Sequence, residues 1–350
     1  MGGTCWPCGA SAVVRFRPSG HRLEAATVQR LADAERTFDP ETCVTNLQAR
    51  FDETGSSAAV PDITQAWDTD EDGLANALDP DDDGDGVADI DDCAPLDPSE
   101  GAGGCNRWSK QFGDAQPQSG ASVALDGSDN VLLTGHFWGT ADFGAGGPLT
   151  SAGADDIFVT TLDSGGGHLW SKRFGDADSQ IAASVAVDDS GNALLTGYFW
   201  GMVDFGGGPL ASTGQSDVFV AKLDANGNHL WSKRFGDAAF QVGASVAVDG
   251  SDNVLLTGFF GGTVDFGAGP LTSAGLDQSA DIFVAKLDPT GGHLWSKRFG
   301  DADAQEGDSI ALDCSVNVLL TGFFAGTVDF GGSVLASNGE YDGFVAKLGP

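Results

Sequence analysis

Basic residues are scarce in this chain of 350 residues, which has 17 Lys and Arg against 51 Asp and Glu and a formal net charge of −34. So acidic a surface repels nucleic acid and anionic membranes, and binding to either is not expected. The same surface attracts cations. Long apolar stretches are missing too: no run reaches 18 residues, so neither a membrane-spanning helix nor membrane insertion is expected.

The opening sequence, MGGTCWPCGASAVVRFRPSG, lacks the apolar core of a secretory signal peptide. Three explanations stay open: the signal has been removed, the start is misassigned, or the chain is not exported by that route. Six cysteines are present, and an even number fits an oxidising compartment. We therefore expect an extracellular or cell-surface location.

The cysteines favour structural over redox roles. Cys93 and Cys105 flank a short loop rich in Pro and Gly and form the expected disulfide. Cys5 and Cys8 have C-x-x-C spacing but no clear strand–helix context, so a small disulfide loop or metal clip is favoured over thioredoxin-like chemistry. The pairing of Cys5, Cys8, Cys43 and Cys314 stays open.

Glycine and proline are abundant, with 52 and 13 residues, which is typical of many short strands joined by tight turns. The chain divides into three parts. Residues 1–61 form a poorly defined N-terminal region with one amphipathic helix expected at 23–38. Residues 62–106 are strongly acidic, and residues 107–350 consist of four tandem repeats.

The acidic part holds fifteen Asp and Glu residues and no Lys or Arg. So many carboxylates need a counter-cation, since two of them about 5 Å apart repel by roughly 3 kcal/mol at an effective dielectric of 20. The pattern D-x-D-x-D-G-x-x-[DN]-x-x-D occurs twice, 13 residues apart, with a backbone carbonyl offered at position 7. Such an oxygen-rich set predicts Ca²⁺ rather than zinc. The predicted ligands are Asp68, Asp70, Asp72, Leu74, Asn76 and Asp79 in the first loop and Asp81, Asp83, Asp85, Val87, Asp89 and Asp92 in the second.

Over about residues 66–105 this stretch resembles a thrombospondin type 3 calcium repeat, including the closing DDCAP. The resemblance implies calcium ions within a core of aspartates and little regular secondary structure. Asn76 at position 9 and the short segment between Cys93 and Cys105 depart from the family pattern. A solvated acidic linker is the alternative interpretation.

The four repeats are marked by WSKQFGD or WSKRFGD, with tryptophans at 108, 170, 231 and 295, and hence a spacing of 62, 61 and 64 residues. Each complete repeat predicts four strands, in the third copy at 244–249, 253–260, 281–288 and 293–300, with a Gly-rich excursion between the second and third. We therefore expect an all-β fold, a β-propeller of four four-stranded blades beside the small irregular calcium segment. A β-solenoid is the alternative.

The recurring segment FVAKLD-x-x-G-x-HLWSKRFGD, followed by SVAVD and NVLLTG, resembles the SBBP family of bacterial β-propeller repeats. The resemblance covers essentially all of residues 107–350. It implies a propeller blade for each repeat. The family name refers to seven blades whereas four copies are present, so the resemblance does not fix the size of the ring.

The phase of the repeat leaves a strand over at each end. The Phe of each FVAKL-type strand precedes the next repeat Trp by 12 residues, so the Trp due after Phe344 would fall at 356, beyond Pro350. The last blade therefore lacks one strand, and residues 107–112 have no blade of their own. We expect them to pair with residues 344–348 and close the ring, or to pair with another molecule in a head-to-tail filament. The residues expected in this contact are Trp108, Lys110, Phe112, Phe344, Ala346 and Leu348.

Other motifs favour structural roles. Asp-Phe-Gly recurs four times and is a repeat turn rather than a kinase motif. His168, His229 and His293 recur at hairpins of separate blades, where metal binding is not favoured. Aromatic residues end each second strand, and core or inter-blade packing is favoured over a glycan- or peptide-binding platform.

Three functional hypotheses follow. The first is a non-enzymatic, exported calcium-binding protein for binding, adhesion or scaffolding, with a surface glycan, a protein or itself as partner. The second is an extracellular filament subunit that exchanges strands through residues 107–112. The third is a hydrolase or lectin on the propeller face, disfavoured because the repeats show no single built active site.

Overall fold

The structure, a computed structural model, describes residues 107–275 and 279–349. The predicted helix at 23–38, the calcium loops and the Cys93–Cys105 disulfide lie outside these residues. Trp108–Pro350 forms one compact unit. The described segments include no helix long and apolar enough to span a membrane.

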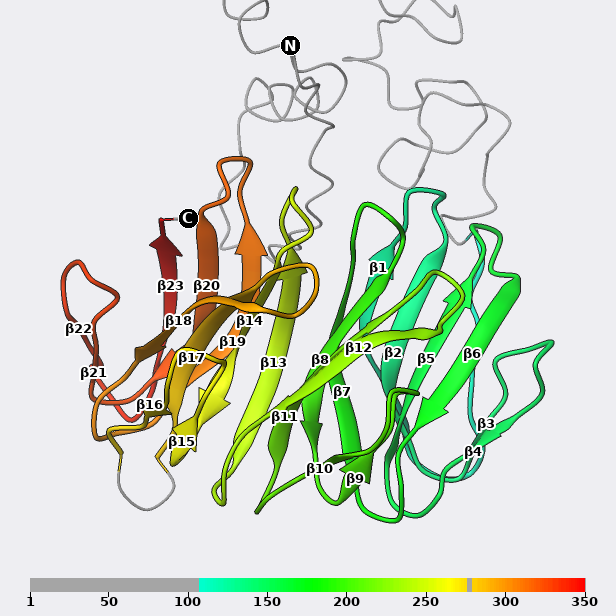
Figure 1. Cartoon of the computed structure of the whole chain (residues 1–350), viewed down its shortest axis with the longest axis horizontal. Helices are drawn as coiled ribbons and strands as arrows, with labels where there is room; N and C mark the ends of the chain where they lie inside the picture. Colours follow the sequence, from blue (N-terminus) through cyan, green and yellow to red (C-terminus); the bar gives the residue numbers. More distant parts are fainter. Residues whose placement is uncertain (1–106, 276–278, 350) are drawn as a thin grey trace, which may run out of the picture. The chain divides into compact units, whose positions relative to one another are not determined.

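Four antiparallel sheets follow one another along the sequence, and each is one blade (Figure 1). The first three have four strands each, in the orders β1-β2-β5-β6, β7-β8-β11-β12 and β13-β14-β17-β18, whereas the fourth has three, β19-β20-β23. The first strands are β1 (Gln118–Leu125), β7 (Gln180–Val187), β13 (Gln241–Val248) and β19 (Gln305–Leu312). The second strands are β2 (Val131–Phe137), β8 (Ala193–Phe199), β14 (Val254–Phe260) and β20 (Val318–Phe324). The third strands are β5 (Asp156–Leu162), β11 (Asp217–Leu223), β17 (Asp281–Leu287) and β23 (Asp342–Leu348), and the fourth are β6 (His168–Phe174), β12 (His229–Phe235) and β18 (His293–Phe299).

The Gly-rich excursion between the second and third strands forms a two-stranded hairpin in every blade, which the sequence did not predict. The aspartate of each Asp-Phe-Gly motif stabilises the turn of this hairpin. In the second blade, for example, Asp204 Oδ1 accepts a hydrogen bond from Gly206 N at 2.7 Å. The Phe of the same motif is buried in the first three blades. The hairpins are β3 (Thr140–Ala141) with β4 (Leu149–Thr150), β9 (Met202–Val203) with β10 (Leu210–Ala211), β15 (Thr263–Val264) with β16 (Leu271–Thr272), and β21 (Thr327–Val328) with β22 (Leu335–Ala336).

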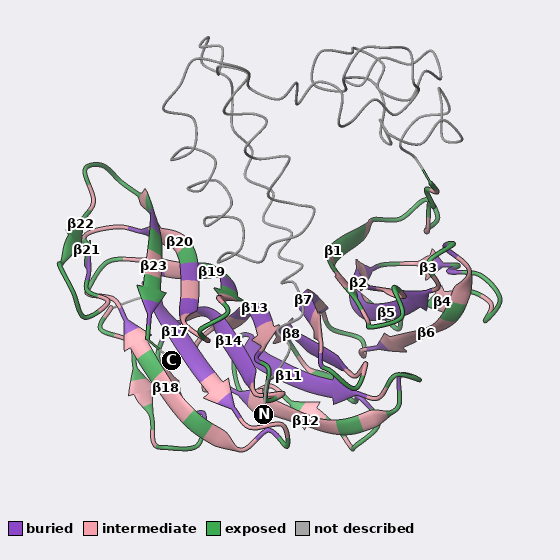
Figure 2. Cartoon of the chain, turned by 90° about the horizontal axis from the view of Figure 1, so that it is seen from above, coloured by how far each residue is buried: buried purple, intermediate pink, exposed green. Residues whose placement is uncertain are grey.

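The blades pack face to face in a row. The first strands contact one another in the order β1, β7, β13, β19, and an apolar core lies between each pair of neighbouring blades. Figure 2 shows buried residues along β11 and β17 in the middle of the row and exposed residues along β1 and β23 at its ends. The all-β, repeated-blade architecture is thus confirmed, while the ring and its number of blades are not.

A β-bulge in each first strand faces a glycine in the second strand. In the second blade the register shifts between Ala182 and Ser184, opposite Gly197. A β-carbon on Gly197 would lie 2.0 Å from the Ile181 carbonyl oxygen and 2.8 Å from a ring carbon of Phe219. The glycine of the repeated LLTG sequence therefore lets the bulged backbone and a core phenylalanine approach the second strand.

Replacing Gly197 with alanine is expected to lower the free energy of unfolding by about 1–3 kcal/mol, because the added methyl overlaps backbone that cannot move freely. Chemical denaturation measures the change. Gly250→Ala is the matched control, since a β-carbon there meets nothing within 4 Å. Equal stability of the two variants would contradict this explanation of the LLTG glycine.

Candidate functional site: blade junctions, open ends and aromatic pairs

Each blade junction joins two different faces. At the first junction, the first blade contributes Ile157 and Val159, and the second blade contributes Val185 and Phe219, all buried. The same arrangement recurs between the second and third blades and between the third and fourth. The junction is therefore one heterologous interface used three times: the leading face of one blade meets the trailing face of the next.

Hydrogen bonds between first strands fix the register of the junctions. The amides of Val185, Val246 and Ile310 donate to the hydroxyl oxygens of Ser122, Ser184 and Ser245 over 3.2, 3.2 and 3.3 Å, respectively. Each serine directly follows the β-bulge of its strand. The bulge thus aims the serine at the next blade, which is a common use of this irregularity.

The repeat tryptophan reaches across the junction from the fourth strand. Trp170 Nε1 donates to the Ala225 carbonyl of the next blade at 2.9 Å, and Trp231 Nε1 donates to the Pro289 carbonyl at 3.0 Å. Lys172 extends alongside and donates to the Gly227 carbonyl at 2.5 Å. The WSKRFGD heptapeptide is therefore a strand that attaches its blade to the following one.

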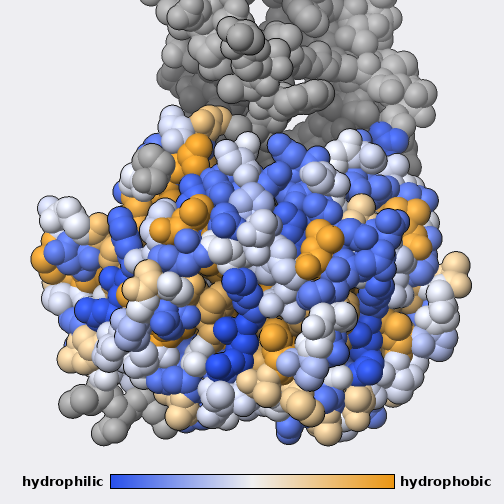
Figure 3. Space-filling model, in the orientation of Figure 1, coloured by the Kyte–Doolittle hydropathy of each residue, from blue (hydrophilic) through white to orange (hydrophobic). Residues whose placement is uncertain are grey.

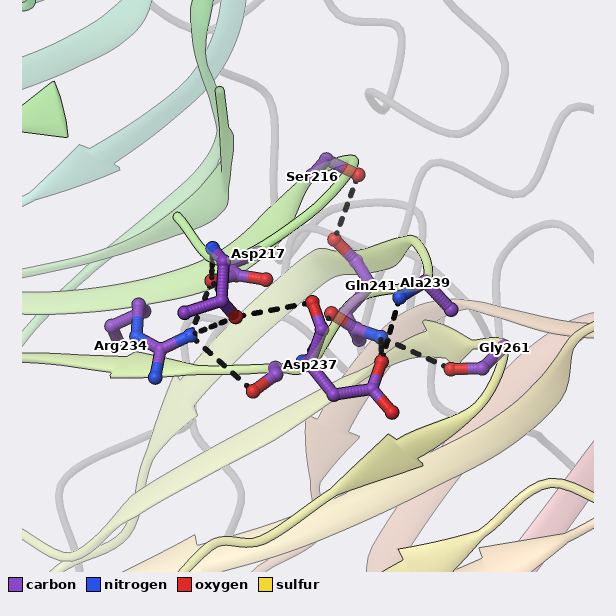
Figure 4. A network of polar contacts seen from close by, with 9 residues as sticks. Ser216, Asp217, Arg234, Asp237, Ala239, Gln241 and Gly261 are labelled. Atoms are coloured by element: carbon purple, nitrogen blue, oxygen red, sulfur yellow. Dashed lines mark hydrogen bonds and ion pairs between the residues drawn. The ribbon is translucent and has the colours of Figure 1, made fainter. Parts of the chain in front are cut away.

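A polar network joins the second blade to the third (Figure 4). Asp217 pairs with Arg234 at 2.5 Å. Asp237 receives a hydrogen bond from Gln241 Nε2 at 2.8 Å, and the same nitrogen donates to the Gly261 carbonyl at 3.0 Å. Ser216 Oγ, beside β11, donates to the Gln241 carbonyl at 3.3 Å and so connects the second blade to the start of β13.

The network recurs at the other junctions around Asp156 with Arg173 and Asp281 with Arg298. Burial raises the pKa of Asp156, Asp217 and Asp281 above its ordinary value, and the arginine beside each carboxylate only partly offsets that effect. Raised carboxylate pKa values often mark catalytic sites. Repetition with the same partners at three junctions favours a structural role here.

Residues 107–113 belong to no sheet of the described chain, yet they make the contacts of a fourth strand. Trp108 Nε1 donates to the Ser164 carbonyl of the first blade at 2.9 Å. The Phe112 and Phe143 rings lie 4.9 Å apart, as do those of Phe174 and Phe205 one junction later. The segment thus lies where the fourth strand of a preceding blade would be.

Lys110 also occupies the position of a fourth-strand lysine. Its stem packs against Gly166 of the first blade, where an added β-carbon would lie 2.8 Å from Lys110 Cε. Lys172 and Lys233 pack in the same way against Gly227 and Gly291. The structure therefore brings Trp108, Lys110 and Phe112 together on the first blade. It does not pair them with β23 within the molecule, so the expected ring closure is not confirmed.

The predicted partners in β23 face inward. Phe344 and Leu348 are buried, and Ala346 is partly buried, in the core between the third and fourth blades. The outer edge of β23 has no neighbouring strand in the described sheets, where β23 pairs with β20 alone. The backbone edge of β23 is thus free to pair with a further strand. The three predicted side chains, however, face the third blade and not the uncovered face of the fourth.

Both ends of the blade row leave apolar side chains exposed. Val123 of the first blade is 61% exposed, while the equivalent Val185 and Val246 are each 5% exposed. Val345 of the fourth blade is 75% exposed, whereas the equivalent Val284 is fully buried. The trailing face of the first blade and the leading face of the fourth are thus junction faces without a neighbour in the described chain.

A second candidate surface is formed by aromatic pairs at the ends of the second strands of the second, third and fourth blades. Ring centroids lie 5.5 Å apart for Tyr198–Trp200, 6.3 Å for Phe240–Phe259 and 5.3 Å for Phe323–Tyr341. Phe137, Phe199, Phe260 and Phe324 are core residues, as the packing interpretation expects, but Trp138, Trp200 and Tyr341 are exposed.

The pairs use different sequence positions in different blades. In the third blade Gly261 stands where the second has Trp200, and a β-carbon there would lie 3.0 Å from the Phe240 ring, so Phe240 fills the place of the tryptophan. The face seen in Figure 3 carries apolar patches separated by hydrophilic residues, on blades that are otherwise rich in polar side chains.

The remaining motifs have local roles. His229 Nε2 lies 3.0 Å from Ser232 Oγ and His293 Nε2 lies 3.1 Å from Ser296 Oγ, each within its own blade. Over residues 107–275 and 279–349, no group of three or more His, Cys, Asp or Glu side chains is placed to hold a metal ion. The predicted calcium ligands, Asp68 to Asp92, lie outside that range.

Comparison of the sequence with known protein families supports the interpretation of the sheets as repeats. The SBBP family, described as a beta-propeller repeat, matches residues 169–201. These residues run from β6 through β8 and so span the first blade junction. The chain is therefore a repeat protein, and residues 169–201 are similar to a β-propeller repeat.

Two further similarities are more distant. The uncharacterized WD repeat-containing protein L264 of Acanthamoeba polyphaga mimivirus is 24% identical over 229 residues, covering 55% of this chain and 16% of that protein. The crystal structure of a protein of unknown function from Bacteroides caccae has a TM-score of 0.33 and 12% identity, covering 66% of this chain and 61% of that chain. At that TM-score the second similarity does not establish a common fold.

Proposed function

We propose that the protein is a non-enzymatic binding scaffold of the extracellular space or cell surface. The blades repeat the same polar groups, and many of these groups bond to one another or to the backbone. Asp188, for example, accepts hydrogen bonds from Asn192 within its turn and pairs with Lys222. The exposed aromatic side chains, by contrast, differ in type and position from blade to blade.

The aromatic pairs are the observation that carries the binding proposal. Trp200 remains 38% exposed although it packs against Tyr198, and Tyr341 is 57% exposed beside Phe323. Tyr and Trp side chains combine a large apolar face with a polar tip and are common anchors of binding surfaces. A surface glycan is the proposed ligand, held by stacking of its sugar rings on these aromatics.

A glycan array tests this proposal. Trp200→Ala is expected to weaken glycan binding at least tenfold, because it removes the exposed ring of one pair. Leu230→Ala is the matched control, since Leu230 is also exposed but lies on a fourth strand away from the pairs. No glycan signal from the unmodified chain, or an equal loss in both variants, would exclude the aromatic pairs as a glycan site.

Calcium binding is the second element of the proposal and rests on the two D-x-D-x-D-G loops of residues 68–92. The chain is expected to retain calcium through purification, and Asp83→Asn with Asp85→Asn is expected to reduce the bound calcium measured by elemental analysis. Asp129→Asn, at an exposed blade turn, is the control and should leave the metal content unchanged. Calcium-free protein after purification in calcium-containing buffer would contradict the proposal.

A further inference from the structure

We infer that copies of this chain associate head to tail, with the fourth blade of one copy packed on the first blade of the next. This inference goes beyond the proposed ligand-binding function and does not depend on it. Its basis is that the two uncovered faces of the blade row are the two halves of an interface that the chain already forms three times.

The exposed serine of the fourth blade supports the match. Ser184 and Ser245 are 9% exposed, because the next blade covers each of them and donates a backbone N–H to its hydroxyl oxygen, whereas the equivalent Ser309 is exposed. The N–H group that would donate to Ser309 belongs to Val123, the equivalent of Val185 and Val246, on the trailing face of the first blade. A second copy supplies that amide in the geometry of the internal junctions.

The segment Trp108–Phe112 supplies the missing strand. It already lies on the first blade where the fourth strand of a preceding blade belongs. When a second copy packs its fourth blade there, its free β23 edge comes beside this segment without any movement of the segment. Each copy thus completes the three-stranded sheet of its neighbour and covers an edge that would otherwise stay unpaired.

Another occupant of these faces is less well matched. Residues 1–106 contain no further copy of the repeat sequence, whereas a second copy of this chain carries both matching faces. A heterologous contact of this kind either closes into a ring or continues as a filament. Two copies contribute eight blades, which lies within the usual range of propellers.

Two differences between the end repeats and the internal repeats are expected to make the contact between copies weaker than the junctions within the chain. Gln111 stands where the other heptapeptides have Arg173, Arg234 and Arg298, so Asp342 of the neighbouring copy meets an amide instead of a guanidinium. Gly343 stands where β17 has the buried Ile282. The net charge of −34 also repels like copies, so association is expected to strengthen as salt rises.

Sedimentation velocity of the full chain across a concentration series tests the inference directly. We expect particles of two or more chains to form as concentration and salt increase. Val345→Asp and Val123→Asp are each expected to abolish them, since both side chains are exposed in the single molecule and aspartate there does not disturb its core. Leu230→Asp, at a residue that is also exposed but lies on a middle blade, is the control and should assemble like the unmodified chain.

Mixing the two deficient variants tests the head-to-tail geometry. Val123→Asp keeps an intact fourth blade and Val345→Asp keeps an intact first blade, so the mixture is expected to form a heterodimer that neither forms alone. An association between identical faces would give no such recovery. A mixture that stays monomeric would overturn the head-to-tail assignment.

A gain of affinity completes the test. Gln111→Arg restores the arginine of the internal junctions opposite Asp342 and is expected to tighten the association about tenfold, as charge-assisted hydrogen bonds do when both partners are present. Asp342→Asn in the same chain is expected to cancel the gain. A chain that remains monomeric at every concentration, with or without Gln111→Arg, would overturn the inference.

Discussion

Replacing Lys222 with methionine is expected to lower the free energy of unfolding by about 3–5 kcal/mol, because it strands a buried carboxylate. Lys222 Nζ lies 2.7 Å from Asp188 Oδ2, and the two side chains are 7% and 1% exposed. Methionine keeps the length of the lysine stem, so lost packing contributes little. Urea denaturation followed by tryptophan fluorescence and circular dichroism measures the change.

Acidification is expected to shrink this difference. Burial raises the pKa of Asp188, but Lys222 and Asn192 together outweigh it, so the pKa lies below its ordinary value of 3.8. A lowered folded-state pKa contributes stability above pH 3.8 that is lost as pH falls through the folded-state value. The gap between the two proteins should therefore be full near pH 7 and narrow below about pH 4.

The chain offers matched controls for Lys222→Met. Lys347 makes the equivalent pair with Asp313 at 2.6 Å but is 58% exposed, so Lys347→Met is expected to change stability only slightly. Asp188→Asn combined with Lys222→Met is expected to recover part of the loss, since it removes the buried charge. Equal losses for Lys222→Met and Lys347→Met would contradict the role given to burial.

Replacing Val284 with aspartate is expected to destabilise the protein by more than about 4 kcal/mol, which is severe for a single substitution. Val284 is fully buried between the third and fourth blades, in an apolar core that also contains Leu255 and Ile310. Loss of soluble folded protein, or a much lower denaturation midpoint, is the expected observation.

Val345→Asp is the matched control, because Val345 occupies the same position of the next blade and is 75% exposed. It is expected to unfold at nearly the same denaturant concentration as the unmodified chain under conditions where both are monomeric. A loss of stability comparable to that of Val284→Asp would show that the end face is covered within one molecule. The pair therefore measures stability and the open end of the blade row in the same experiment.

The strands were predictable because the repeat displays them four times. Recurrence of NVLLTG, FVAKL and WSKRFG with turn residues between them fixed the strand boundaries to within a few residues, as the third blade shows at β13, β14, β17 and β18. The three-stranded fourth sheet also follows from the repeat phase, since the chain ends before the next heptapeptide.

Pairing and contacts were less accessible from sequence. The hairpins in the Gly-rich excursions have strands of two residues, too short to show a hydrophobic period. The network around Asp217, Arg234 and Gln241 depends on strand pairing within one blade and on contacts with the next blade. The recurrence of these residues in the repeats is a signal that could have been followed. Ring closure was inferred from matching deficits at the two ends, which do not determine whether the strands meet within one molecule or between two.

Cryo-electron microscopy of the assembled full chain shows directly whether copies associate head to tail through their end blades. We expect a ring or row of more than four blades, with residues 108–112 of one copy beside β23 of the next and β1 packed on the neighbouring fourth blade. Isolated particles of four blades, or a ring of four blades closed within a single chain, would contradict this expectation.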